Sequence, residues 1–239
     1  MSTLQVEALS KSFGGLRVFA DIDFTVESGG LLGVIGPNGA GKTTLINVVT
    51  GRQMPTSGRV LLDGRDVSGQ PAHAMSRLGV TRSFQQTNTF KSVSVRENIV
   101  RAIRFGGRGV PAGLETLLGE FKLSDRLDEQ SDKLPYGLQK MLGLVMAYAT
   151  APSVLLLDEP AAGLEHAERH QIDAFVTHVR AAGRCSVLIV EHDMDLIRRL
   201  CPRILVLDAG VLLADGSPAE VLARPDVIAA YLGDTEEVA

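Results

Sequence analysis

The sequence predicts an α/β fold with a mainly parallel central sheet, an antiparallel β side sheet and an inserted α-helical subdomain. Continuous apolar runs are expected of central parallel strands covered on both faces, and they occur at 31–35, 154–157 and 186–190. Period-two alternation, typical of half-buried antiparallel strands, occurs at 4–9 and 22–26. The contrast between these patterns predicts a buried parallel core with a second sheet beside it.

Shorter signals extend both sheets. Further strands are expected at 60–64 and 79–84, and the first of these can join the antiparallel sheet. Near the C-terminus, apolar runs at 203–207 and 211–213 flank an Asp-Ala-Gly turn, which predicts a closing hairpin. Residues 217–220 combine an N-cap Ser, a Pro and a Glu, so a short helix follows.

The middle of the chain has helical signals. Ser94 and Glu97 form a capping-box pattern that begins a helix, and a glycine cluster after Arg104 ends it. Further helices are expected at 114–121 and 138–149. We therefore predict one domain over residues 1–239, with an inserted helical subdomain at about 87–150.

Composition restricts the class of protein. The 45% hydrophobic and 22% charged residues are ordinary for a soluble globular protein of 239 residues. A net charge of -4 gives no reason to expect nucleic acid as a partner. No apolar run is long enough to span a bilayer and the N-terminus has no signal-peptide form, so we expect the chain not to enter the membrane. Cys185 and Cys201 lack metal-ligand spacing and are expected to be reduced packing residues.

A phosphate-binding loop follows the apolar run at 31–35 and precedes a helix-like stretch. Its glycines let successive backbone N–H groups converge on phosphates, helped by the positive end of the following helix. The loop has the Walker A form, which predicts a P-loop NTPase core that binds a nucleoside triphosphate. Lys42 is expected to reach the β and γ phosphates and Thr43 to hold Mg²⁺. The loop residues are Gly36, Pro37, Asn38, Gly39, Ala40, Gly41, Lys42 and Thr43.

A pair of acids ends the apolar run at 154–157. Asp158 is expected to hold Mg²⁺, and Glu159 to polarise a water molecule against the γ-phosphate as the catalytic base. An isolated Asp-Glu pair is often only a solvated strand end. The four preceding aliphatic residues and Pro160 favour the functional interpretation.

A third motif lies before the apolar helix predicted at 138–149, with the sequence Leu134-Pro135-Tyr136-Gly137-Leu138-Gln139-Lys140. Together with the preceding motifs, Gln85 and His192, and in the same order, it resembles the signature loop of ATP-binding-cassette (ABC) ATPases. The resemblance covers essentially the whole chain. It implies that Gly137 caps the ATP of another subunit, so that a second ABC ATPase, identical or different, completes each site.

The resemblance also assigns single residues. Gln85 is similar to the family's Q-loop glutamine, which senses Mg²⁺ and water, with Gln86 as the alternative. His192 is similar to the switch histidine that contacts the γ-phosphate and joins Lys42 and Glu159 as catalytic. Phe13 matches the aromatic residue that stacks on adenine, and a plain core role is its alternative. Val18 is expected to line the adenine pocket and Thr44 to contact the α-phosphate.

Two positions depart from the family pattern. Pro135 stands where a serine hydroxyl commonly touches the γ-phosphate, so one hydrogen bond worth about 1.5–3 kcal/mol is missing. Glu165 stands where the family usually has Asp or Asn. If the chain pairs with a different ATPase that carries the serine, we expect the two sites of the dimer to be unequal.

Four local strings resemble ATPase subunits of branched-chain amino-acid importers, at 82–85, 158–164, 190–194 and 227–233. The resemblance implies ATP and Mg²⁺, transmembrane permease subunits and an external or periplasmic solute-binding protein. It also implies a peripheral place at the cytoplasmic face of the inner or plasma membrane. Uptake of urea or amides and lipopolysaccharide export remain alternatives. A soluble ABC switch and a P-loop kinase are disfavoured, respectively by the single acidic cassette and by the signature loop.

Overall fold

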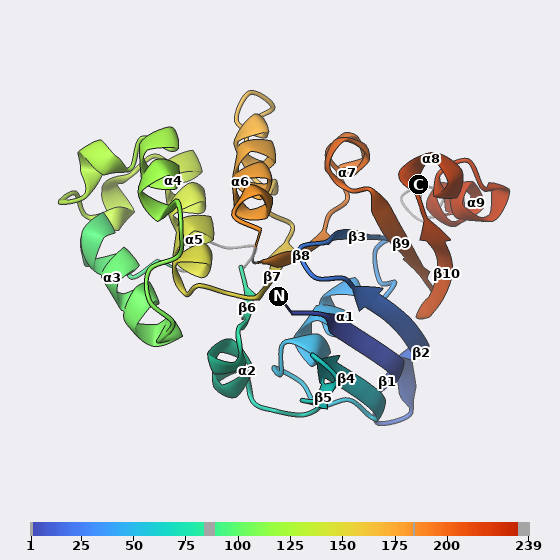
Figure 1. Ribbon diagram of the computed structural model, residues 1–239. Helices are drawn as coiled ribbons and strands as arrows, with labels where there is room; N and C mark the ends of the chain where they lie inside the picture. Colours follow the sequence, from blue (N-terminus) through green and yellow to red (C-terminus); the bar gives the residue numbers. More distant parts are fainter. Residues whose placement is uncertain (1, 84–88, 184, 234–239) are drawn as a thin grey trace.

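A computed structural model describes residues 2–83, 89–183 and 185–233 (Figure 1). Its larger sheet has the strand order β10-β9-β3-β8-β7-β6. All neighbours in this sheet are parallel except the β9–β10 hairpin, which is antiparallel as predicted. The strands are β3 (Leu31–Ile35), β6 (Val80–Arg82), β7 (Val154–Asp158), β8 (Ser186–Val190), β9 (Arg203–Asp208) and β10 (Val211–Gly216).

The smaller sheet is antiparallel, with the order β2-β1-β4-β5, which confirms the predicted side sheet. Its strands are β1 (Leu4–Phe13), β2 (Leu16–Val26), β4 (Ser57–Leu62) and β5 (Arg65–Asp66). Strands β1 and β2 are longer than predicted. The register of β1 shifts between Val6 and Leu9, around Ala8 with its positive φ of 44°, so the period-two pattern stops before the strand does.

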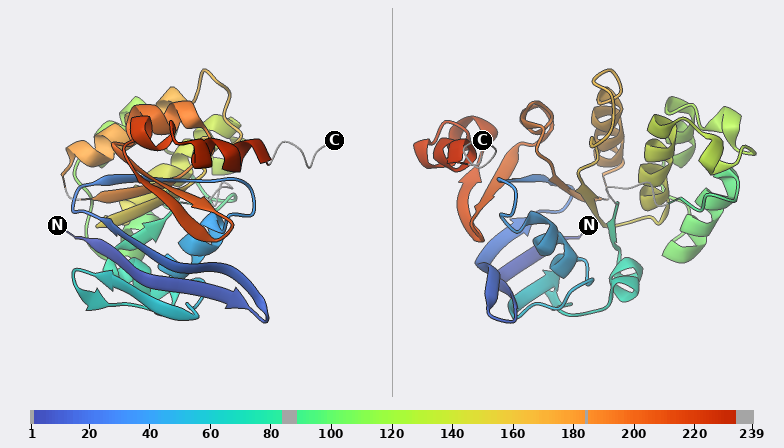
Figure 2. Two further views of the ribbon diagram at one scale, coloured as in Figure 1. Left: turned by 90° about the vertical axis from the view of Figure 1, so that its right-hand side faces the viewer. Right: turned by 180° about the vertical axis from the view of Figure 1, so that it is seen from behind.

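Two apolar cores lie on opposite faces of the larger sheet (Figure 2). Leu155 and Leu157 face the core shared with α5 (Tyr136–Ala149), α6 (His170–Ala181) and α7 (Met194–Leu200). Leu156 faces the other core, shared with α1 (Lys42–Val49) and the antiparallel sheet. Because both faces are covered, every residue of β7 is buried, which explains the continuous apolar run in the sequence.

The helical part lies between β6 and β7 in sequence and comprises α3 (Val95–Gly106), α4 (Leu114–Glu120) and α5, with short 3-10 turns at Ser124–Arg126 and Ser131–Lys133. The Ser94 side chain caps α3 by accepting a hydrogen bond from the Glu97 backbone N–H at 3.2 Å, which is one half of the predicted capping box. The Glu97 carboxylate accepts a hydrogen bond from Arg101 at 3.0 Å. Helix α5 begins two residues earlier than predicted. Pro135 is its N-cap, in an extended conformation that allows the helix to begin at the next residue.

The remaining helices are short. They are α2 (Ala72–Leu78), α8 (Pro218–Val221) with the predicted Ser217–Glu220 capping box, and α9 (Pro225–Gly233). Helices α2, α6, α7 and α9 are not among the predicted elements. For α6 the sequence does hold a signal, because its buried residues recur at helical spacing: Ile172, Phe175, Val176 and Val179.

Within the described ranges, none of the helices combines the length and the apolar character that crossing a membrane requires. Cys185 and Cys201 are both buried and free, as expected of packing residues. Burial raises the pKa of each thiol to about 12.

Candidate functional site

Three loops meet at the carboxyl edge of the larger sheet. Strand β8 lies between β3 and β7, and all three run parallel. Val34, Val190 and Asp158 occupy one row across these strands. The segments that follow them, namely the loop at 36–43, Glu191 with His192, and Glu159, therefore leave the sheet at the same edge. This topology places the phosphate-binding loop beside the predicted catalytic residues.

The glycine-rich loop has the backbone that a phosphate cradle needs. Gly36, Gly39 and Gly41 have φ values of 151°, 79° and 97°, in the region that favours glycine. A Cβ atom at Gly36 would collide with the Leu207 carbonyl oxygen. Gly41 is the N-cap of α1, and no side chain caps that helix. The first turn of α1, with Thr43 and Thr44, thus presents its backbone N–H groups and positive end to the loop.

Lys42 reaches back over this loop. Its ammonium donates hydrogen bonds to the carbonyl oxygens of Gly36 at 2.7 Å and Pro37 at 2.8 Å. The cation therefore lies above the cradle, where a phosphate would meet it.

Asp158 is 5% exposed at the end of β7, and a buried cation holds it. Arg82 on β6 donates through Nη2 to Asp158 Oδ2 at 2.5 Å and through Nη1 to Asn47 Oδ1 at 2.5 Å. Both partners of this ion pair have side chains 7% exposed. Sequence reasoning missed Arg82, since the pair joins residues 76 positions apart.

The oxygen donors at this edge suit Mg²⁺, which proteins commonly bind through only one or two side-chain oxygens, with substrate phosphates and water as the other ligands. Thr43 supplies a hydroxyl and Asp158 a carboxylate, whose Oδ2 already accepts from Arg82. No cluster of three or more His, Cys, Asp or Glu ligands occurs in the described part of the chain. Gln85 and its alternative Gln86 lie outside the described residues.

Glu159 and His192 follow neighbouring strands. Glu159 adopts a positive φ of 45°, and its backbone N–H donates to the Val190 carbonyl oxygen at 2.8 Å. The side chain of His192 is 66% exposed. Next to His192, Glu191 is almost completely buried. Its carboxylate accepts hydrogen bonds from the backbone N–H of Ala161, in the turn after β7, and from that of His192, in the turn after β8. Sequence reasoning missed this role of Glu191.

Phe13 and Val18 lie at the side sheet, in the β1–β2 hairpin. Phe13 is 46% exposed, so the alternative that it is a core residue is wrong. The Lys11 ammonium lies 4.5 Å from the centroid of its ring. Val18 lies against the phosphate loop, since a Cβ atom at Gly41 would be 3.5 Å from Val18 Cγ1. Val18 and the loop are thus brought together.

Gly137 lies elsewhere in the molecule. It is in the first turn of α5, which packs with α3 and α4, whereas α1 lies on the other face of the sheet beside the antiparallel strands (Figures 1 and 2). Pro135 provides no side-chain cap for α5. The Glu168 carboxylate lies directly against Gly137, and the Tyr136 ring lies against Gly163. The predicted signature loop and the phosphate loop therefore belong to elements on opposite faces of the larger sheet.

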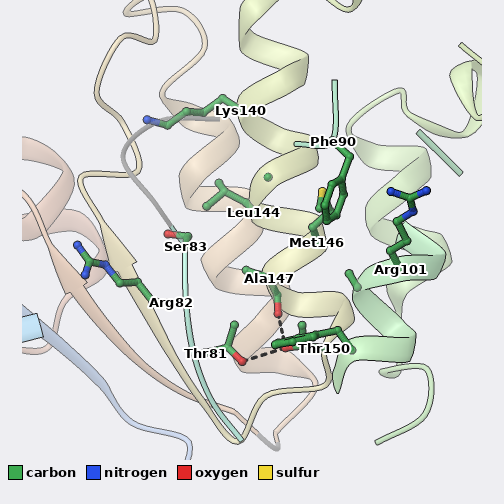
Figure 3. A pocket seen from close by; sticks show the side chains of 13 residues that line it. Thr81, Arg82, Ser83, Phe90, Arg101, Lys140, Leu144, Met146, Ala147 and Thr150 are labelled. Carbon is green, nitrogen blue, oxygen red and sulfur yellow. Dashed lines mark hydrogen bonds between the residues drawn. The ribbon is translucent and has the colours of Figure 1, made fainter. Parts of the chain in front are cut away.

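An apolar groove runs between β6, α3 and α5 (Figure 3). Phe90 and Phe105 are 50% and 57% exposed there, and the Arg101 guanidinium lies 5.0 Å from the Phe90 ring centroid. Arg82 and Lys140 also line the groove, but their charged ends point away from Phe90 and Met146 (Figure 3). Arg82 and Lys140 thus contact both the groove and residues at the carboxyl edge of the sheet, since Arg82 binds Asp158 and Lys140 binds the Glu159 carbonyl oxygen.

Comparison with known proteins decides the family. The family model described as "ABC transporter" matches residues 19–162, more than half of the chain. The chain belongs to the ABC transporter ATPases. A second model, described as "Branched-chain amino acid ATP-binding cassette transporter", matches residues 211–237.

Curated relatives of this ABC ATPase match it over almost its full length. It is 36% identical to the "High-affinity branched-chain amino acid transport ATP-binding protein BraF" of Pseudomonas aeruginosa, over 97% of this chain and 98% of the relative. It is 35% identical to the corresponding LivG of Escherichia coli (strain K12), over the same shares. A probable LivG of Archaeoglobus fulgidus is 33% identical, over 98% of this chain and 96% of the relative.

Solved ATP-binding cassettes share the fold. The ADP conformation of MJ1267, an ATP-binding cassette of an ABC transporter, matches with a TM-score of 0.86 and 28% identity, over 98% of this chain and 99% of that one. A nucleotide-free cassette from an ABC transporter matches with a TM-score of 0.85. The predicted family and fold class are therefore confirmed, and the chain is a nucleotide-binding ATPase subunit of a transporter.

Proposed function

We propose that this ABC ATPase hydrolyses ATP to energise an importer of branched-chain amino acids or related small solutes. The names of the curated relatives support the solute class, and so does the match of the C-terminal model to residues 211–237. The convergence of the phosphate loop, Asp158, Glu159 and His192 at one sheet edge carries the assignment of chemistry.

In the proposed site, the backbone of residues 36–44 binds the phosphates of ATP, and Lys42 moves from its carbonyl partners to the β and γ phosphates. Thr43, Asp158 and Gln85 hold Mg²⁺, which when bound neutralises charge on the phosphate oxygens. Phe13 stacks on adenine beside Val18. These roles follow from the resemblance together with the geometry of the described residues.

Glu159 acts as general base in this proposal. It follows directly on the row that holds Asp158, and in this role its carboxylate takes a proton from the water molecule that attacks the γ-phosphate. His192, exposed at the end of the neighbouring strand, contacts the γ-phosphate and stabilises charge there.

A second ABC ATPase, identical or different, completes each site. The placement of Gly137 in α5, on the face of the larger sheet opposite to α1, supports a role at the nucleotide of another chain. At a dimer interface, the N-terminus of α5 instead points its positive end at the partner's γ-phosphate. We propose that residues 1–239 act as one cassette in which the insert at about 87–150 serves both this contact and the permease.

Membrane subunits are the second class of partner. The groove between β6, α3 and α5 exposes Phe90 and Phe105, so it offers an apolar seat for a short segment of a permease subunit. The chain then lies at the cytoplasmic face of the membrane, with the external solute-binding protein contacting the permease only. Nucleic acid has no part in this proposal.

Uptake into vesicles tests the proposal. The chain is purified with its permease subunits, reconstituted with the solute-binding protein, and tested with radiolabelled leucine and with urea. We expect ATP-dependent uptake of leucine that is lost in Glu159→Gln. Copurification with ribosomes or DNA in place of membrane subunits would contradict the transport role, and uptake of urea alone would contradict the solute class.

A further inference from the structure

Glu191 is a buried acid to which the proposed chemistry gives no role. It follows β8 and is 1% exposed. Oε1 accepts a hydrogen bond from the Ala161 backbone N–H at 2.7 Å, in the turn after β7. Oε2 accepts from the backbone N–H groups of His192 at 3.1 Å and Asp193 at 3.4 Å, in the turn after β8. Each oxygen of one carboxylate thus serves a different loop of the site.

The turn that carries Glu159 is also held from its other side. Lys140 of α5 is 3% exposed, and its ammonium donates to the carbonyl oxygens of Ala162 at 2.8 Å and Glu159 at 3.3 Å. The carbonyl groups of the turn therefore face a cation, while the N–H of Ala161 faces the anion of Glu191. Burial lowers the pKa of Lys140, and the nearby carboxylates of Glu191, Glu159 and Asp158 oppose this shift.

The backbone of this turn needs such support. Glu159 has a positive φ of 45°, a conformation that costs a residue with a side chain free energy unless its surroundings fix it. Both oxygens of Glu191 are occupied and the side chain is shielded from solvent, so Glu191 itself is not placed to activate water.

We propose that Glu191 is a positioning residue that fixes the catalytic turn at Glu159 relative to the switch turn at His192, with Lys140 bracing the same turn from α5. The proposal rests on the proposed function, in which Glu159 is the base and His192 contacts the γ-phosphate. Glu191 acts on hydrolysis through these two residues and leaves the phosphate loop unchanged.

Glu191→Gln tests this with minimal change of shape. The amide keeps one acceptor oxygen but presents an NH₂ donor to the N–H groups of the other turn. Because hydrogen bonds to a charged group contribute strongly, we expect kcat to fall about 10- to 100-fold. The Kd for ATP, measured with a fluorescent analogue, stays within about twofold. In the Glu159→Gln background, the added Glu191→Gln causes a smaller further loss of turnover than in the wild type, since one of the two residues through which it acts is already gone.

Ser186→Ala is the matched control. Ser186 is 1% exposed at the opposite end of β8, where its hydroxyl accepts from Gly29 N–H and donates to the Ser2 carbonyl oxygen. It is expected to lower Tm without changing kcat. If Glu191→Gln also lowers Tm with kcat unchanged, Glu191 is a structural residue only and the proposal is wrong.

Lys140→Met decides the question if Glu191→Gln does not fold. We expect the same separation of kcat from ATP affinity, and an unchanged kcat overturns the proposal. A wild-type chain that does not hydrolyse ATP in the assembled transporter, or a fully active Glu159→Gln, instead contradicts the proposed function. The two failures are therefore distinguishable.

Discussion

The sheet edge and the helical part differ in completeness. At the sheet edge, one chain brings together the phosphate loop, Asp158, Glu159 and His192, and buried contacts such as Arg82–Asp158 hold them. In the helical part, Gly137 lies in the first turn of α5, on the face of the larger sheet opposite to α1 and the phosphate loop. The difference supports the proposal that one chain binds the nucleotide and that a second chain is needed for hydrolysis.

The largest effect is expected when the general base Glu159 is removed from the sheet edge. Glu159→Gln keeps shape but cannot take a proton, so we expect ATP turnover to fall about 10²- to 10⁴-fold. ATP remains bound and holds two subunits together, which gel filtration with ATP detects. Glu115→Gln, at an exposed position of α4, is the control and should hydrolyse ATP normally. Unchanged turnover in Glu159→Gln would remove Glu159 as the base.

Arg82→Met tests whether the buried Arg82–Asp158 ion pair stabilises the sheet edge. The change leaves the Asp158 carboxylate buried without its cation, which typically costs about 3–5 kcal/mol of unfolding free energy. Urea unfolding of the nucleotide-free chain measures this loss. Arg101→Met, in the same groove but more exposed, should lose less than 1 kcal/mol, as a surface cation–π contact does. An equal loss of unfolding free energy in the two variants would show that the buried ion pair stabilises the chain no more than the exposed contact of Arg101 does.

How much the sequence predicts differs between the regions for a physical reason. The phosphate loop and the run before Asp158 are local patterns, so residues 36–43 and 154–159 could be identified directly. Contacts such as Arg82–Asp158 and Ala161–Glu191 join distant segments, and no periodicity reveals them. The capping pattern at Ser94 predicted α3, but nothing local showed that Glu168 lies against Gly137.

Pro135→Ser tests the role of the N-terminus of α5 in the helical part. It restores the hydroxyl that the family pattern has at the N-cap of α5, and a hydroxyl is a strong N-cap. We expect ATP-dependent association of subunits to tighten by roughly tenfold, the equivalent of one hydrogen bond. Binding of ATP by the isolated chain should not change. A changed affinity of the isolated chain for ATP would instead show that residue 135 contacts the nucleotide bound by its own chain.

The smallest effect concerns reactivity. Because burial raises the pKa of Cys185 and Cys201 to about 12, almost no thiolate exists at pH 8. The folded chain should therefore react slowly with a disulfide reagent such as dithionitrobenzoate, and both thiols should react at once in urea. Rapid reaction of either thiol in the folded chain would contradict its buried position.

Tandem-linked dimers test whether each site combines the sheet edge of one chain with the helical part of another. In one dimer, the first copy carries Lys42→Ala and the second Gly137→Asp; in the other, one copy carries both changes. ATP turnover is compared with that of the wild-type tandem. We expect the first dimer to keep one intact site and to hydrolyse ATP, and the second to be inactive. The opposite result, activity only when one copy carries both changes, would show that each chain contains a whole site.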